Sequence, residues 1–248
     1  MSHDRQHSRR KASVWRILTA TALTVATLPL LGSSVANAIT VGGFEIDGNM
    51  VSDGDLDWAT AGDQPAATDG TGANETLAFV PGNTAKELNP DNWSFDNSAV
   101  TPDANDIGDL YEYSTTDPVT GDQHIFFGFE RAKNTGSIAY SIELNQLSAA
   151  PNSNGFLVPD RSVGDVLISV TQQGGSVFSI DGVYTWNGSD WSLVPGGIAA
   201  IVGATNAAPI TDVDGNSLPA GRFLELSVNL SDIFGVPSCP GKNFESLN

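Results

Sequence analysis

The sequence predicts an all-β protein, an antiparallel two-sheet β-sandwich of jelly-roll type that follows a cleaved signal peptide. Three observations predict this class. Short segments with alternating apolar and polar residues recur after Asp122, turn residues such as Gly, Asn and Asp separate them, and no window of about a dozen residues after residue 38 keeps the apolar period of a helix. The chain is long enough for one sizeable core and shows no internal repeat, so we expect one domain, residues 39–248.

The N-terminal segment predicts an export signal that is not part of the fold. Basic residues precede an apolar run, Ile17 to Leu31, and the small residues around Ala38 follow it. The run is shorter than the roughly 20 residues of a membrane-spanning helix, which makes an N-terminal membrane anchor the less favoured reading. We therefore expect residues 1–38 to be a signal peptide, with cleavage after Ala38. The mature chain is expected to be secreted, in the medium or at the cell surface, without inserting into a membrane.

Residues 39–121 are rich in Asp, Asn, Gly, Thr and Pro, and only short apolar islands interrupt them. This composition predicts mostly loops. Beyond Asp122 the pattern changes to strands, because apolar residues alternate with polar ones in segments 124–132 and 137–146. The linker 133–136 predicts a hairpin that joins these two segments.

Segment 166–173 continues the alternation, and segment 177–194 predicts a three-stranded meander. Asp181-Gly182 and Asn187-Gly188 lie between its short apolar runs, and such dipeptides are the strongest local signal for tight hairpin turns. A further strand is expected in 198–204.

The last predicted strand is 223–230, where every second residue is apolar. Leu224, Leu226, Val228 and Leu230 share one face, and Phe223, Glu225, Ser227 and Asn229 share the other. Ser231 is expected to cap a short helix after this strand.

The charge balance is strongly acidic. Residues 1–38 hold 5 of the 11 basic and 1 of the 29 acidic side chains, so the remaining 210 residues carry a formal charge of −22. Nucleic acids and anionic lipid surfaces are therefore not expected as partners, and cations are the natural counter-ligands.

Residue types disfavour several kinds of active site. After residue 38 the chain has one histidine, His124, and one cysteine, too few for a histidine-cysteine zinc site. A serine triad would have to use His124, which we interpret as a partly exposed residue at the start of a strand. There is no phosphate-binding glycine loop and no dinucleotide fingerprint, so no nucleotide cofactor is expected. We expect a non-enzymatic protein, and a glycoside hydrolase with paired carboxylates is the open alternative.

Calcium is the ion that the composition fits, because it takes about six to eight oxygen ligands from carboxylates, amides and backbone carbonyls. The candidate ligands are acidic residues in two clusters: Asp47, Asp53, Asp55, Asp57, Asp103, Asp106 and Asp109. Segment 212–216 is a third, weaker cluster. In the first cluster Trp58 occupies the place of the glycine that a helix-loop-helix calcium loop requires and no glutamate closes the loop, and the other two clusters do not complete such a loop either. The alternative for each cluster is an Asx turn, in which the side chain binds its own backbone.

Tryptophans are the second group of candidate ligand-binding residues. Trp58 and Trp93 are the candidates for a platform on which a sugar ring stacks, and core packing is the alternative for both. Trp186 follows an alternating segment and is expected to pack. The expected partner is a cell-wall or extracellular glycan or protein.

Cys239 is the only cysteine, so no disulfide can form within the chain. The sequence closes on GKNFESLN without a sorting signal. We therefore expect a truncated product of a longer protein, with Cys239 either free or paired with a residue beyond Asn248.

Several segments resemble the N-terminal domain of large secreted actinobacterial surface proteins, whose later parts often carry prealbumin-like repeats. The segments are GFEIDGNM…LDWA, AKELNPDNW, DIGDLYEY and HIFFGFERAKNTGSIAYSIELNQ. This resemblance implies a β-sandwich at the cell surface without an assigned activity. The opening IDG…DW with the later DLY…IFFGFE also resembles, more weakly, jelly rolls of the family 9 carbohydrate-binding and DOMON-like type.

The weaker resemblance implies binding of sugar or haem, with structural calcium in some members. Haem is not expected here, because it needs axial His or Met ligands and only His124 and Met50 remain after residue 38. We therefore expect a non-enzymatic secreted or cell-surface domain that is structural or adhesive and stabilised by calcium. The alternative is an extracellular carbohydrate-binding module.

Overall fold

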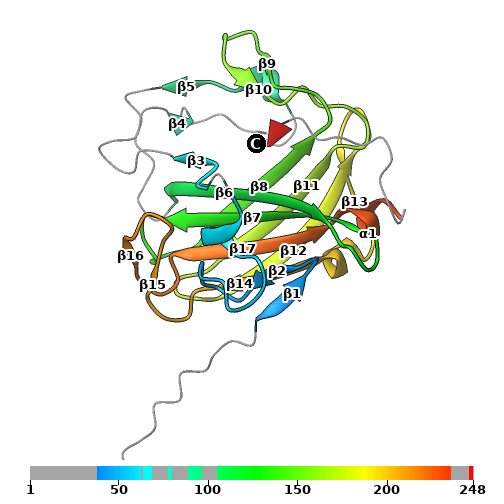
Figure 1. The fold of residues 1–248 in the computed structure, drawn as a ribbon. Coiled ribbons are helices and arrows are strands. Elements are labelled where there is room, and N and C mark those ends of the chain that lie inside the picture. Colours follow the sequence, from blue (N-terminus) through cyan, green and yellow to red (C-terminus); the bar gives the residue numbers. More distant parts are fainter. Residues whose placement is uncertain are drawn as a thin grey trace, which may run out of the picture. The chain divides into compact units, whose positions relative to one another are not determined.

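The computed structural model describes residues 38–62, 64–68, 78–79, 89–96, 105–235 and 246–247. Two five-stranded antiparallel sheets form the centre of this part of the chain (Figure 1), which confirms the predicted all-β, sandwich-like fold. Sheet 1 consists, in spatial order, of β13 (Trp191–Leu193), β12 (Phe178–Trp186), β11 (Val166–Gln172), β8 (Ile138–Asn145) and β18 (Ser246–Leu247). Sheet 2 consists of β14 (Ile201–Thr205), β17 (Phe223–Asn229), β7 (Gln123–Arg131), β6 (Ile107–Thr116) and β3 (Ala67–Thr68).

Smaller elements surround the two sheets. The antiparallel pairs are β1 (Ile39–Val41) with β2 (Phe44–Ile46), β4 (Ala78–Phe79) with β5 (Phe95–Asp96), β9 (Ala150–Pro151) with β10 (Leu157–Val158), and β15 (Ile210–Thr211) with β16 (Ser217–Leu218). The helical turns are η1 (Trp58–Thr60), η3 (Pro90–Asn92), η4 (Gly197–Ala200) and α1 (Leu230–Phe234).

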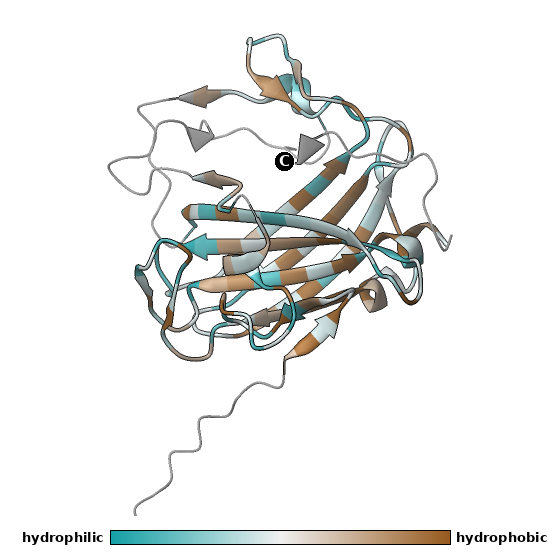
Figure 2. Cartoon of the chain, viewed as in Figure 1, coloured by the Kyte–Doolittle hydropathy of each residue, from teal (hydrophilic) through white to brown (hydrophobic). Residues whose placement is uncertain are grey.

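The main core lies between the two sheets, because alternate residues of each strand face the other sheet. Leu224, Leu226 and Val228 of β17 face this core, as predicted, and Ile168 of β11 and Tyr140 of β8 are among those that meet them from sheet 1. Figure 2 shows apolar positions in brown alternating with paler polar positions along these strands.

A second core covers the opposite face of sheet 2. It joins Phe44, Ile46, Met50 and Trp58 from the N-terminal segment to Tyr111, Phe126 and Phe223 of the sheet and Leu218 of β16. The ring of Phe44 lies 4.5 Å from that of Phe126 and 4.8 Å from that of Trp58. Each fully buried ring contributes roughly 1.5–3 kcal/mol. Residues 38–62 therefore form a third layer on sheet 2, which we call the N-terminal cover.

The predicted hairpin between 124–132 and 137–146 is wrong. Strand β7 pairs with β6 and β17 in sheet 2, whereas β8 pairs with β11 and β18 in sheet 1, so the linker crosses between the sheets. An alternating strand buries the same face whether its sequence neighbour lies beside it or across the core, so the pattern cannot distinguish the two arrangements.

The turn predicted at Asn187-Gly188 is confirmed, since residues 187–190 join β12 to β13 and Gly188 has a φ of +102°. The turn at Asp181-Gly182 is wrong, because β12 runs through it. The pairing with β11 shifts register there, so Asp181 is the extra residue of a β-bulge. Segment 177–194 therefore supplies two strands, β12 and β13, and not the three predicted; the meander observed consists of β11, β12 and β13.

The prediction of mostly loops before Asp122 missed strand β6. This strand lies between β7 and β3 in sheet 2 and pairs with β7 along most of its length. Its second half alternates between partly or fully buried residues, beginning with Tyr111, and exposed ones, beginning with Glu112. That alternation is present in the sequence but is surrounded by Asp, Asn and Gly, which favour loops.

The short helix after β17 is confirmed, but its cap is not Ser231. The side chain of Asn229 accepts a hydrogen bond from the backbone N–H of Asp232 at 3.1 Å, and Ser231 lies inside the helix. The Ser231 hydroxyl instead accepts from the backbone N–H of Gln123. No helix in the described ranges is long and apolar enough to cross a membrane.

Substitution of Gly48 tests how closely the N-terminal cover approaches sheet 2. The Cβ of an alanine there would lie 2.6 Å from the carbonyl carbon of Thr205 in β14, and the φ of +83° disfavours any L residue. We expect Gly48→Ala to cost roughly 2–5 kcal/mol of unfolding free energy.

Gly43 supplies the matched control, because its φ is +84° but no atom lies within 4 Å of the added Cβ. Gly43→Ala is expected to cost only about 1–2 kcal/mol, the strain of a left-handed backbone. Urea unfolding of both variants measures the difference, and equal midpoints would contradict the close approach of Gly48 to β14.

Candidate functional site

Glu225 holds the N-terminal cover against sheet 2. It lies in the middle of β17 and its side chain is fully buried. Its Oε1 accepts from the backbone N–H groups of Asp47 at 2.7 Å and Gly48 at 2.5 Å, and its Oε2 accepts from the indole N–H of Trp58 at 2.8 Å. Burial raises the pKa of Glu225 well above its ordinary value. One carboxyl group therefore joins a strand of the sandwich to two parts of the cover.

Glu45 of β2 organises the same segment from the other side. It is 4% exposed and accepts hydrogen bonds from the backbone N–H groups of Asp53 at 2.7 Å and Asp55 at 3.0 Å. The conformation of the acidic loop is thus set by carboxylates that bind backbone amides. Neither Glu45 nor Glu225 was among the predicted site residues.

Three of the predicted calcium ligands in this loop accept hydrogen bonds from within the N-terminal cover. Asp47 accepts from the backbone N–H of Asn49 at 2.8 Å, which is the geometry of an Asx turn. Asp55 accepts from the hydroxyl of Thr40 at 2.9 Å. Asp57 caps η1, since its Oδ1 accepts from the backbone N–H of Trp58 at 2.6 Å.

Asp57 also has an oxygen that the fold does not use. The residue is fully buried, and its Oδ2 has no hydrogen-bond partner. Burial, together with the smaller effect of the nearby carboxylates of Asp47, Glu45 and Asp53, raises the pKa of Asp57 to about 7. A buried carboxyl in this setting holds either a proton or a cation.

Calcium matches the donor types of this loop but not a closed site. The side chain of Asp53 is exposed and makes no hydrogen bond within the described residues, and the buried Oδ2 of Asp57 is unpaired. These are the hard oxygen donors that calcium prefers. However, no three Asp, Glu, His or Cys side chains in the described part of the chain converge as a metal-binding group. If calcium binds in this loop, Asp53 and Asp57 are the residues whose unpaired oxygens would hold it.

The other predicted acids lie elsewhere. Asp103 lies outside the described residues, as does Cys239. Asp106 is buried just before β6, where its carbonyl accepts from the backbone N–H of Ala132. Asp109 lines a pocket on sheet 2. In the third cluster Asp212 accepts from the backbone N–H groups of Asp214 and Asn216, so this segment is an Asx turn.

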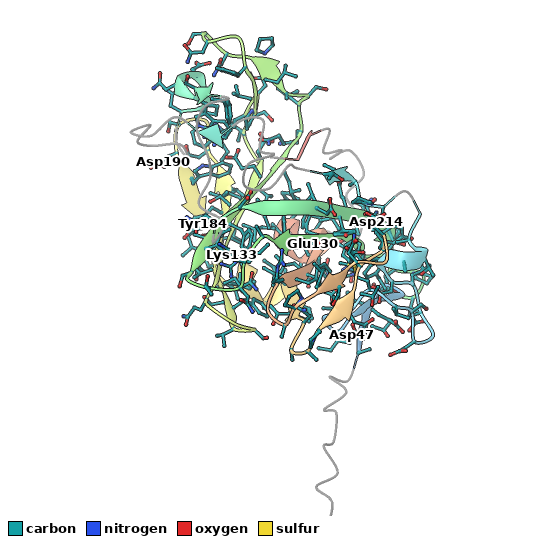
Figure 3. The ribbon with its side chains drawn as sticks, turned by 90° about the vertical axis from the view of Figure 1, so that its left-hand side faces the viewer. Asp47, Glu130, Lys133, Tyr184, Asp190 and Asp214 are labelled. Carbon is teal, nitrogen blue, oxygen red and sulfur yellow. The ribbon has the colours of Figure 1, made fainter. Side chains whose placement is uncertain are left out.

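The pocket has a volume of about 310 Å³ and lies where β6, β7 and the β15–β16 pair meet. Figure 3 labels Glu130, on β7, and Asp214, in the turn between β15 and β16. We call it the β6–β7 pocket. Its polar lining residues include Asp109, Glu130, Asp212, Asn216, Ser217 and Arg222.

A β-bulge brings two carboxyl groups to this pocket. The register of β6 with β7 shifts between Ile107, which pairs with Arg131, and Leu110, which pairs with Phe129. Gly108 and Asp109 therefore lie opposite Glu130, so two residues face one. Bulges often redirect side chains next to binding sites, and this one turns Asp109 to the pocket.

The two carboxyl groups have different environments. Glu130 is 7% exposed and accepts from the hydroxyl of Tyr111 at 2.5 Å, and burial raises its pKa to about 7. Asp109 is partly exposed, but its Oδ1 is buried and has no hydrogen-bond partner. Because Asp109 is partly exposed at the pocket and its carboxylate makes no hydrogen bond within the described residues, it is a candidate to accept one from a ligand.

Two arginines line the pocket: Arg222 is partly exposed, whereas Arg131 is fully buried. The Nε of Arg222 donates to the carbonyl of Arg131 at 2.6 Å, which fixes the guanidinium group of Arg222 at the pocket wall. Within the described residues its Nη atoms make no hydrogen bond. Arg222 lies close enough to Glu130 to lower the pKa of that carboxyl, against the larger effect of burial.

The two predicted tryptophan platforms have different surroundings. Trp58 is fully buried in the second core and lies 5.7 Å from the ring of Tyr111, so its indole faces are not open to a sugar ring. Trp93 is partly exposed and follows η3, where its carbonyl accepts from the side chains of Asn152 and Asn154. Trp186 packs in the structure, as expected, with its ring 5.2 Å from that of Trp191.

No protein-family model matches this chain, and neither the curated proteins nor the solved structures searched include a match.

Proposed function

We propose that residues 39–248 act outside the cell as a non-enzymatic domain with an adhesive or structural role. The observation that carries this proposal is how the buried charged side chains are used. Glu225 and Glu45 bind backbone amides, and Arg161 forms a buried ion pair with Glu143. These contacts use the buried charges to hold segments of the fold together, which is consistent with a structural domain.

The position of His124 also supports a non-enzymatic role. The residue is 6% exposed, in contrast to the partial exposure predicted for it, and its ring stacks with that of Phe126 at 6.2 Å. Burial lowers its pKa below the ordinary value. His124 does not line the β6–β7 pocket, so the one histidine after residue 38 does not contribute to that cavity.

Export and surface location are supported by the sequence. The N-terminal segment has the order of charge, apolar run and small residues that is typical of a signal peptide. The resemblance to N-terminal domains of large secreted actinobacterial surface proteins supports the same location. The strongly acidic composition keeps such a domain soluble in the medium.

Adhesion can be measured with beads that carry the purified protein. We expect the beads to remain on cell-wall fragments or on surfaces coated with extracellular glycan or protein under flow that removes control beads. The control beads carry an unrelated folded protein of similar net charge, because electrostatic attraction alone would retain both. Equal retention of the two kinds of bead on every surface would contradict an adhesive role. Release of hydrolysis products from a surface would contradict the non-enzymatic part of the proposal.

We further propose that calcium stabilises the acidic loop of the N-terminal cover. An ion that binds only the folded state at about a hundredfold excess over its Kd adds about 2.7 kcal/mol. Millimolar calcium is therefore expected to raise the unfolding temperature by roughly 5–10 °C relative to EDTA.

Magnesium at the same concentration is the control, because it demands a tighter octahedral site and should have little effect. Asp53→Asn is expected to reduce the calcium effect, since Asp53 has an exposed carboxylate that makes no hydrogen bond within the described residues. An unfolding temperature that is the same in EDTA and calcium would contradict calcium binding. The acids of this loop would then serve only to form Asx turns and to cap backbone N–H groups.

A further inference from the structure

The β6–β7 pocket places hydrogen-bond donors beside hydrogen-bond acceptors. Its volume of about 310 Å³ lies at the lower end of the range for small-molecule sites, so it suits one compact unit of a ligand. The walls come from three strands of sheet 2 (β3, β6 and β7) and from the β15–β16 pair, which gives the pocket a rigid frame.

Asp109 is the acceptor that the fold leaves unused. The residue is partly exposed at the bulge of β6 and lines the pocket, and its carboxylate makes no hydrogen bond within the described residues. Asp212, by contrast, is occupied by its own turn, because both of its oxygens accept from Asn216 or Asp214. Of these two carboxylates, Asp109 is thus the one available to a ligand.

Arg222 is the donor that the fold leaves partly unused. The bond from its Nε to the carbonyl of Arg131 orients the guanidinium group, and its Nη atoms are available within the described residues. Glu130 completes the site, because its carboxyl group can act as a hydrogen-bond acceptor or as a donor. It accepts from Tyr111, and burial raises its pKa to about 7, so near neutral pH it can also donate a proton.

The balance of charges in the pocket selects the class of ligand. A bound cation would lie next to Arg222, and a bound anion would lie next to Asp109 and Asp212. Either charge would meet repulsion in a confined space. A neutral ligand with several hydroxyl groups avoids both penalties, since each hydroxyl can donate to a carboxylate and accept from a guanidinium.

Aromatic stacking does not contribute to this site. No Phe, Tyr or Trp is among the described residues that line the pocket. Recognition therefore depends on hydrogen bonds to charged groups, which are stronger than those between neutral groups.

We propose that the β6–β7 pocket binds one neutral hexose unit of a glycan, with Asp109 accepting from its hydroxyl groups and Arg222 donating to them. This inference rests on the proposed adhesive function for its biological setting and gives that function a ligand class. The pocket itself is tested in solution, independently of adhesion.

Titration calorimetry and ligand-observed NMR on the purified protein test the ligand class. The probes are methyl glycosides of glucose, galactose, mannose and N-acetylglucosamine, together with glucosamine as a cationic sugar, glucuronate as an anionic sugar, and glycine as a zwitterion. We expect saturable binding of at least one neutral glycoside, and at least about tenfold weaker binding of the three charged probes. No binding of any neutral glycoside, or tighter binding of a charged probe, would overturn the proposal.

Three variants test the site. Asp109→Asn and Arg222→Gln are each expected to weaken binding of the preferred glycoside by about tenfold or more. Asp214→Asn is the matched control, because this exposed acid lies in the same turn region but does not line the pocket, and its affinity should stay within about twofold. Unchanged affinity in both pocket variants would overturn the assignment.

Ser217→Trp keeps the test decisive if Arg222→Gln fails to fold. Ser217 is exposed on the pocket lining, so a large side chain there fills the pocket without removing a buried contact. We expect this variant to fold and to lose glycoside binding. If beads coated with Ser217→Trp adhere as well as beads coated with the wild type, the pocket is not the adhesive site, although the protein is still adhesive. Absence of adhesion by wild type, with glycoside binding retained, would instead overturn the adhesive function.

Discussion

Replacement of Glu225 by alanine is expected to lower the free energy of unfolding by roughly 3–5 kcal/mol. The change removes the acceptor for the backbone N–H groups of Asp47 and Gly48 and for the indole N–H of Trp58. Each buried donor that loses its partner costs about 1–3 kcal/mol. The variant also leaves a cavity between β17 and the N-terminal cover, and local loosening of the cover should expose Trp58 to solvent.

Urea unfolding followed by tryptophan fluorescence measures this loss. Glu225→Gln is the informative companion, because it keeps one carbonyl acceptor and the side-chain volume, so its cost should be lower than that of alanine. Glu112→Ala is the control, since Glu112 lies on β6 of the same sheet but is exposed. If Glu225→Ala cost no more than Glu112→Ala, Glu225 would not be the anchor of the cover.

The second large effect is a loss of stability as the pH rises through 7. Burial raises the pKa of Asp57 from 3.8 to about 7, so between about pH 4 and 7 the folded protein holds a proton that the unfolded chain has released. Stability from this group is complete below about pH 4 and is lost as the pH rises through its folded value. A gap of about three pH units corresponds to about 4 kcal/mol.

Asp57→Asn isolates this contribution, because the amide cannot ionise and its carbonyl oxygen can still cap η1. We expect the variant to be more stable than wild type by roughly 2–4 kcal/mol at pH 8 and by much less at pH 5. Asp53→Asn removes the same charge from an exposed position of the loop and should not show this dependence.

Other groups do not obscure the comparison. Glu130, whose pKa burial raises to about 7, acts in the same direction as Asp57 but is present in both proteins. Burial lowers the pKa of His124, which opposes the trend at acid pH in both proteins alike. A stability difference between Asp57→Asn and wild type that did not change from pH 5 to pH 8 would contradict the buried, titrating state of Asp57.

The strands after Asp122 could be predicted because their pattern is local. In β17 the alternation from Phe223 to Asn229 places each residue on the face that it occupies. The local pattern does not show which segment covers the other face of β17. Glu225 shares that face with Phe223, and in an open sheet it would be a solvent-facing residue, but the N-terminal cover buries it.

The candidate site was less predictable for a related reason. Asp109 was included among the acids of its cluster, but the pocket depends on the bulge that sets it opposite Glu130 and on Arg222, some 90 positions along the chain from Arg131, whose carbonyl it binds. No pattern along the sequence marks a two-against-one pairing. The acidic clusters at 47–57 and 212–216 were recognised, and in the structure Asp47 and Asp212 make the Asx-turn contacts that were the alternative to metal binding.

The location of the mature chain tests the central claim most directly, because an adhesive domain must act outside the cell. Cells that produce the full chain are separated into medium, protease-treated intact cells and cytoplasm, and the N-terminus of the recovered protein is sequenced. The proposed function predicts protein in the medium or in the protease-sensitive fraction, beginning at Ile39. Protein retained in the cytoplasm, protected from protease and still carrying residues 1–38, would contradict it.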